Sequence, residues 1–157
     1  MSTYNFKSVG KTKDQEKTEN EATQGSLIPY GIKTPLKISQ SDGLFELNFD
    51  LAEQFADNLR NLLLTNWGER LGQYDFGANL KPLTTEFVSQ ENFDNEAISR
   101  IQSAVNRWMP FIDLENFSST IDRMENKNTA IVRVNITYNI PALSVYNKGI
   151  QITLYVI

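Results

Sequence analysis

Apolar residues recur along this chain with two different spacings, and each spacing predicts one kind of element. In two segments they fall three or four positions apart, which is the spacing of one face of an α-helix. Asn48 or Asp50 is a suitable N-cap for the first helix, and Pro110 ends the second, which runs from about Asn92 to Trp108. The two apolar stripes, both predicted to pack in the core, are Leu51, Phe55, Leu59, Leu62 and Leu63, and then Phe93, Ala97, Ile98, Ile101, Val105 and Trp108.

The C-terminal third changes to a spacing of two, the period of a β-strand with one buried face. This alternation predicts strands over Thr129–Ile140 and Gly149–Ile157, with a turn at Asn147-Lys148-Gly149 between them. A weaker strand is predicted over Ile112–Asp122. The predicted fold class is therefore α+β, with two main helices packed on a small antiparallel β-sheet.

The N-terminal part divides into a tail and the start of the fold. Residues 26–157 are predicted to form a single α+β domain that opens with an N-terminal hairpin around Ser41-Asp42-Gly43. Residues 1–25 are polar and mix lysine with acidic residues, so we expect a flexible tail. Within it, Gly10–Thr12 resembles the end of a phosphate-binding loop, but Asn5 stands where that loop requires a glycine. We therefore expect no nucleotide site in the tail.

Composition narrows the chemistry that the chain can perform. Its 157 residues include no cysteine and no histidine, and the formal net charge is −4 at pH 7. Thiol chemistry and most zinc sites are thereby disfavoured, and the negative charge offers no general attraction to nucleic acid or to an anionic membrane. No apolar run approaches the roughly 20 residues that a membrane span requires. We expect no cofactor, no metal, no nucleic-acid partner and no membrane partner.

The segment that follows the first helix has an unusual composition. Residues 62–80 read LLLTNWGERLGQYDFGANL, and Gly68 stands where a C-cap glycine is expected. Arg70 is expected to fork to carbonyl groups or to a carboxylate of the next segment. Aromatic residues mixed with arginine are typical of interfaces rather than of linkers. The aromatic residues are Trp67, Tyr74 and Phe76, and they lie beside Glu69, Arg70 and Asp75.

This stretch carries a resemblance to a known family. It contains Leu-Thr-x-x-Gly-Glu-Arg at Leu64–Arg70, then Asp-Phe-Gly at Asp75–Gly77, then Leu80. In these residues and their spacing the chain resembles the sheath-initiator (baseplate wedge) family of contractile-tailed phages, whose members also occur in type VI secretion and related injection machines. The resemblance extends over Leu27 to Ile157 and leaves the tail outside it.

The end of the second helix departs from the family pattern. The family has Trp-Glu-Pro-Arg-Ile, and this chain has Trp108-Met109-Pro110-Phe111-Ile112, so Met109 and Phe111 replace an acidic and a basic residue. If the family contact survives at this corner, it must be apolar; the alternative is that the docking partner differs. The resemblance implies that both stretches dock on the baseplate wedge. The implied wedge-docking residues are Trp67, Gly68, Glu69, Arg70, Asp75, Phe76, Gly77, Trp108, Met109, Pro110 and Phe111.

The resemblance further implies where such a protein works. It would lie in the tail baseplate of a virion, assembled in the host cytoplasm, with six copies per baseplate ring. Its partners would be baseplate wedge proteins and the tail sheath protein, whose polymerisation it starts. The C-terminal strand would pair with an arm of the first sheath ring; a covered strand in a closed core is the alternative. The residues implied in this pairing are Ile150, Gln151, Ile152, Thr153, Leu154, Tyr155 and Val156.

Two other classes of function stay open at the level of sequence. An older name for the family is lysozyme-like, and glycoside hydrolysis needs two carboxylates, for which Glu69 and Asp75 are the candidates. A carboxylic acid that donates a proton requires a raised pKa, which Arg70 nearby would oppose. A soluble adaptor with the same fold is the second alternative. We expect a structural protein rather than an enzyme.

Overall fold

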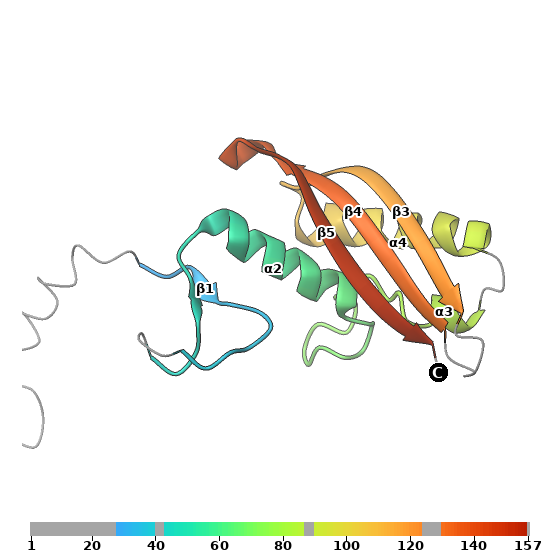
Figure 1. The fold of residues 1–157 in the computed structure, drawn as a ribbon, viewed down its shortest axis with the longest axis horizontal. Helices are drawn as coiled ribbons and strands as arrows, with labels where there is room; N and C mark the ends of the chain where they lie inside the picture. The colour runs from blue at the N-terminus through green and yellow to red at the C-terminus, as the bar shows by residue number, and fades with distance from the viewer. Residues whose placement is uncertain (1–27, 40–42, 87–89, 124–129, 157) are drawn as a thin grey trace, which may run out of the picture.

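A three-stranded antiparallel sheet, backed by helices on one face, forms the body of the protein (Figure 1). The computed structural model describes residues 28–39, 43–86, 90–123 and 130–156. The strands of this sheet lie in the order β3–β4–β5, with bounds Asp113–Arg123, Ala130–Ile140 and Val145–Val156. The helices are α2 (Leu51–Leu64), a short α3 (Leu83–Glu86) and α4 (Gln90–Trp108). The predicted α+β class is confirmed.

The hydrophobic core lies between the helices and the sheet, as the two spacings predict. Along β4 every second side chain is buried, and α2 and α4 contribute the residues that face them. The buried residues of β4 are Val132, Val134, Ile136, Tyr138 and Ile140. Those of α4 are Phe93, Ala97, Ile101, Ala104 and Val105. The spacing of apolar residues therefore predicted the element type correctly in both regions, because a helix turns every third or fourth side chain toward the core and a strand turns every second one.

The connection between β4 and β5 differs from the prediction. The chain turns at the 3-10 helix η1 (Pro141–Leu143), and β5 begins at Val145. Asn147-Lys148-Gly149 therefore lies inside β5, where Lys148 pairs with Tyr138. Asn147 does adopt a positive φ of 54°, as it would in a turn, but next to an irregularity in the β4–β5 register. Asparagine tolerates this conformation in bulges and turns alike, so residue type alone did not separate them.

The helix ends follow local chemistry. Asp50 is the N-cap of α2, and its carboxylate accepts a hydrogen bond from the backbone N–H of Ala52 at 2.9 Å. Of the two predicted caps, Asp50 is therefore correct, and Asn48 lies buried in the preceding strand. Helix α4 ends at Trp108, two residues before Pro110, as expected.

The predicted N-terminal hairpin is present as a short two-stranded ribbon (Figure 1). Strand β1 (Gly31–Ile32) pairs antiparallel with β2 (Leu47–Asn48), and an isolated bridge joins Ile38 to Phe45. The first two residues of the predicted turn lie outside the described residues, as do the predicted tail and Gly10–Thr12.

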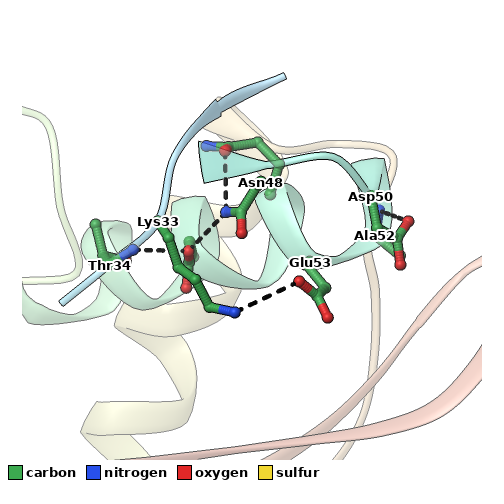
Figure 2. Close-up of polar contacts among 8 residues, drawn as sticks. Lys33, Thr34, Asn48, Asp50, Ala52 and Glu53 are labelled. Carbon is green, nitrogen blue, oxygen red and sulfur yellow. Dashed lines mark hydrogen bonds and ion pairs between the residues drawn. The ribbon is translucent and has the colours of Figure 1, made fainter. Parts of the chain in front are cut away.

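Polar side chains attach this hairpin to α2 (Figure 2). The side-chain amide of Asn48 donates to Asp57 at 2.8 Å and to Gln54 at 3.1 Å, and the backbone N–H of Thr34 also donates to Asp57 at 2.9 Å. Burial acts to raise the pKa of Asp57, but these hydrogen bonds outweigh it and hold that pKa below its ordinary value. Lys33 adds an ion pair to Glu53 at the surface. Ionised Asp57 is thus the acceptor that joins Asn48 of β2, and Thr34 two residues after β1, to the helix.

Acid should weaken this attachment. Because the pKa of Asp57 is lower in the folded than in the unfolded protein, its carboxylate stabilises the folded state above the unfolded value, near pH 4, and this stabilisation is lost as the pH falls through the folded value. In an NMR titration the backbone amide of Thr34 should therefore shift below pH 4. Asp57→Asn should abolish that shift and lower the stability at pH 7. A Thr34 amide that titrates identically in both proteins contradicts the assignment.

Candidate partner-binding groove

The chain ends α2 and then folds back over the end of that helix. Thr65 is the C-cap, and its backbone N–H donates to the carbonyl of Asn61 at 3.1 Å. The prediction that Gly68 caps the helix is wrong in position: Gly68 lies beyond the cap, in a turn with a φ of 86°. Its N–H donates to the carbonyl of Tyr74 at 2.7 Å. The positive φ was expected, but it serves the loop rather than the helix.

Gly77 permits the closest approach in this region. A Cβ built on Gly77 would lie 2.2 Å from the backbone oxygen of Thr65, and the residue has a φ of 110°. The next residue, Ala78, donates its N–H to the carbonyl of Leu62 at 3.0 Å, and the indole N–H of Trp67 donates to the carbonyl of Gly77 at 3.1 Å. The returning chain therefore satisfies a carbonyl at the end of α2 and closes the loop at its base.

Glu69 holds the first turn of the loop together. Its two carboxylate oxygens accept hydrogen bonds from the backbone N–H and the side-chain amide of Asn66, each at 2.8 Å. These two bonds lower the pKa of Glu69. The side-chain oxygen of Asn66 in turn accepts from the backbone N–H of Lys81 at 3.2 Å, which ties the turn to the returning chain.

Arg70 does not act as predicted. Within the described residues its guanidinium forms neither an ion pair nor a hydrogen bond, and Cζ lies 4.3 Å from the centroid of the Phe76 ring. The Phe76 ring meets Trp108 edge to face, with centroids 5.2 Å apart. The expected fork to a carboxylate is therefore absent from this part of the chain, and Arg70 stacks on an aromatic face instead.

Asp75 and Trp67 face another side of the loop. Asp75 forms an ion pair with Arg107 of α4, and the Arg107 guanidinium lies 5.2 Å from the Trp108 ring centroid. Arg100 of α4 donates to the carbonyl of Asn79 at 2.9 Å, and its guanidinium lies 5.6 Å from the Trp67 ring. Between the loop and α4 lies a hollow of about 280 Å³, whose lining includes Trp67, Asp75, Arg100 and Arg107. They fix the loop on α4.

The three residues that follow α4 differ in their exposure to solvent. Met109 is buried and Pro110 is exposed. Phe111 is 38% exposed, and its ring centroid lies 4.6 Å from that of Phe55 on α2. The backbone N–H of Ile112 donates to the carbonyl of Met109 at 3.0 Å and closes the turn that aims Phe111 at α2.

Loop, corner and α2 together form a groove with a volume of about 780 Å³, which we call the α2 groove. It brings together six of the eleven predicted docking residues, from stretches about thirty positions apart. The sequence reasoning missed its α2 wall, because Phe55 and Leu62 belong to a stripe that was assigned wholly to the core. Its lining residues are Phe55, Asn58, Asn61, Leu62, Thr65, Glu69, Arg70, Phe76, Trp108, Met109 and Phe111.

The C-terminal strand lies at an edge of the sheet. Among the described residues β5 pairs with β4 and with no other strand. Ile150, Ile152 and Leu154 are buried against the helices, whereas Gln151 and Tyr155 are exposed on the opposite face. The predicted alternation is confirmed up to Tyr155; the side chain of Val156 and the whole of Ile157 lie outside the described part.

The carboxylates of the loop are poorly suited to glycoside hydrolysis. A general acid must hold a proton near neutral pH, which requires a raised pKa. The pKa of Glu69 is lowered, and the carboxylate of Asp75 is engaged in the ion pair with Arg107. Across the described residues, no three histidine, cysteine, aspartate or glutamate side chains are grouped so as to hold a metal ion. No helix in the same ranges is long and apolar enough to cross a membrane.

Comparisons with known proteins identify a shared fold. No protein-family model matches the chain, and no curated protein sequence matches it significantly. A chain in the cryo-EM structure of the anti-feeding prophage baseplate superposes with a TM-score of 0.56 at 21% identity, over 69% of this chain and 82% of that chain. A crystal structure of a candidate tail lysozyme from Geobacter sulfurreducens gives 0.47 at 19% identity, over 68% and 90%. The first likeness shows the same fold.

The return over α2 should depend on the glycine at position 77. Gly77→Ala places a methyl group against the Thr65 carbonyl and also strains a positive φ, so we expect a loss of about 3 kcal/mol or more in the free energy of unfolding. Gly72→Ala is the matched control, because Gly72 has a φ of 79° but no atom within 4 Å of the new Cβ, and should lose only about 1–2 kcal/mol. Urea denaturation measures both, and equal losses would contradict the close approach.

Proposed function

We propose that this protein is a structural, non-enzymatic component of the baseplate of a contractile injection machine such as a phage tail. The observation that carries the proposal is the α2 groove, in which residues of the Gly-Glu-Arg and Asp-Phe-Gly stretches meet the altered corner at Trp108–Phe111. A concave surface lined mainly by apolar and aromatic side chains, with a few polar groups among them, is the usual form of a binding site. The fold shared with a chain of the anti-feeding prophage baseplate supports the same assignment.

The α2 groove is the proposed docking surface for the baseplate wedge. Its exposed apolar side chain at the corner is Phe111, which takes the place of a basic residue in the family pattern, whereas Met109 is buried. Aromatic residues set in a pocket are the usual centres of binding energy at protein interfaces. The proposed contact at this corner is therefore apolar, with Phe111 as its centre.

Phe111→Arg should abolish docking without unfolding the chain. A charged side chain in this position removes apolar contact and brings an unpaired cation into the interface, so incorporation into purified tail particles should fall at least tenfold. Leu71→Arg is the matched control, because Leu71 is 91% exposed at the loop tip, outside the groove. Immunoblots of purified particles measure incorporation, and circular dichroism checks folding. If a folded Phe111→Arg protein is incorporated as well as the wild-type protein, Phe111 is not the centre of the docking contact.

The second part of the proposal concerns the start of the sheath. Six copies in a ring would each offer the free edge of β5 to an arm of the first sheath ring, which would extend the sheet by one strand. Two observations support this role: β5 pairs on one side within the described residues, and from Gly149 to Val156 it carries neither lysine nor proline, the residues that normally protect an edge. The alternative in which β5 is covered on both sides is not favoured by this strand order.

Strand addition has a specific signature in amide exchange. In an edge strand alternate N–H groups point away from the sheet, so half of the amides from Ile150 to Tyr155 should exchange quickly in the isolated protein. Added sheath protein should slow that half and leave the other half unchanged. Hydrogen-exchange mass spectrometry or NMR measures this pattern. Amide exchange that is the same with and without sheath protein would exclude strand pairing. A soluble one-to-one complex with another protein, with no effect on particle assembly, would favour the adaptor alternative.

A further inference from the structure

The α2 groove contains two charged residues in adjacent positions, Glu69 and Arg70, and the structure uses them differently. Both oxygens of Glu69 already accept hydrogen bonds from Asn66. Arg70 is exposed, and none of its N–H groups donates to another residue in the described ranges. The guanidinium Cζ lies over the Phe76 ring, 4.3 Å from its centroid, and this contact with the ring uses none of the five N–H donors of the guanidinium as a conventional hydrogen bond. Glu69 is thus committed to the loop, and Arg70 is the free cation of the groove.

The walls of the α2 groove indicate what kind of segment fits. They are built from side chains of α2, of the loop and of the corner, and no strand edge lines them, so an occupant cannot join them by main-chain pairing. The wall formed by α2 and its C-cap runs from Phe55 to Thr65, a rise of ten residue steps, which at 1.5 Å per step is about 15 Å. Three turns of a helix have this length, and a helix laid in an apolar groove is recognised through the side chains of one face.

The charge of the groove indicates which polar group the occupant carries. One guanidinium is unpaired, and Glu69 beside it keeps a lowered pKa and therefore its negative charge. A phosphate would bring two negative charges into a groove that already holds this carboxylate, whereas a single carboxylate matches the single unpaired guanidinium of the groove. Arginine binds a carboxylate through two parallel hydrogen bonds, and a guanidinium already stacked on a ring loses little freedom when it does so.

We propose that the α2 groove binds an amphipathic helix of a neighbouring protein, whose apolar face packs on Phe76, Trp108 and Phe111 and whose aspartate or glutamate forks to Arg70. This inference rests on the proposed docking function of the groove and adds the chemistry of the partner. It separates two adjacent residues by role: Arg70 selects the partner, and Glu69 shapes the loop.

Three helical peptides serve as probes of this chemistry. Each has leucines on one face and differs at one position among them, which is glutamate, glutamine or lysine. In ¹⁵N NMR titrations with the full chain, the glutamate peptide should shift the Arg70 Nε signal and should bind at least tenfold more tightly than the glutamine peptide. The lysine peptide should bind most weakly. Equal affinity of the three peptides, including no detectable binding of any, overturns the proposal.

Variants of the two adjacent residues test whether the effect belongs to Arg70. Arg70→Gln should remove the preference for the glutamate peptide, and Arg70→Lys should restore only part of it, because an ammonium group cannot fork. Neither variant should change thermal stability much, since Arg70 is exposed and unpaired. Glu69→Gln is the contrasting variant: it should lower stability through Asn66, and because it removes a negative charge from the groove it should keep or increase the preference for glutamate. If Glu69→Gln abolishes that preference as fully as Arg70→Gln does, the effect acts through loop shape and the proposal fails.

Incorporation of the two variants into tail particles distinguishes this inference from the docking proposal on which it rests. Loss of incorporation in both Phe111→Arg and Arg70→Gln supports both. Loss of incorporation in Phe111→Arg alone supports the docking proposal and overturns the role of Arg70. Normal incorporation of both folded variants overturns docking, and the inference with it.

Discussion

The last carbonyl groups of an α-helix have no partner within the helix, and here the chain supplies partners by folding back over the end of α2. The backbone N–H groups of Ala78 and Asn79 donate to the carbonyls of Leu62 and Thr65. This return is possible because Gly77 has no side chain to meet the Thr65 carbonyl. Once it is made, Phe76 is held against Trp108 and Arg70 against Phe76, so the groove follows from the way the helix ends.

The elements that could be predicted are those whose burial imposes a period. Helix α4 and strand β4 bury one face along most of their length, and both were placed to within one or two residues. Turns were harder because several residue types suit one backbone conformation. Asn147 and Ser144 share a φ of 54°, yet only the connection at Pro141–Ser144 reverses the chain. Helix α3 is too short for any periodic signal.

The residues of the loop side of the site could be predicted from the sequence, but the different role of each residue could not. The loop sequence identified aromatic and charged residues that meet other parts of the chain, and it gave no means of telling Glu69 from Arg70. That distinction depends on Asn66, whose backbone and side chain both turn toward the Glu69 carboxylate. The α2 wall was hidden for a related reason: a helical stripe identifies apolar positions, but whether Phe55 faces the core or a groove depends on the elements that arrive later in the chain.

The loop after α2 is closed by its own contacts, which has a consequence for how such proteins diversify. Its base is held by Gly77 and Ala78, its neck by the Gly68–Tyr74 hydrogen bond, and its tip at Leu71 and Gly72 lies in solvent. A closed loop of this kind tolerates insertion at the tip, because the closure entropy grows slowly with length and the ends stay in place. Lineages could therefore lengthen or recode the tip to suit new neighbours while the helices and sheet remain unchanged, and an engineer could graft a recognition peptide at the same point.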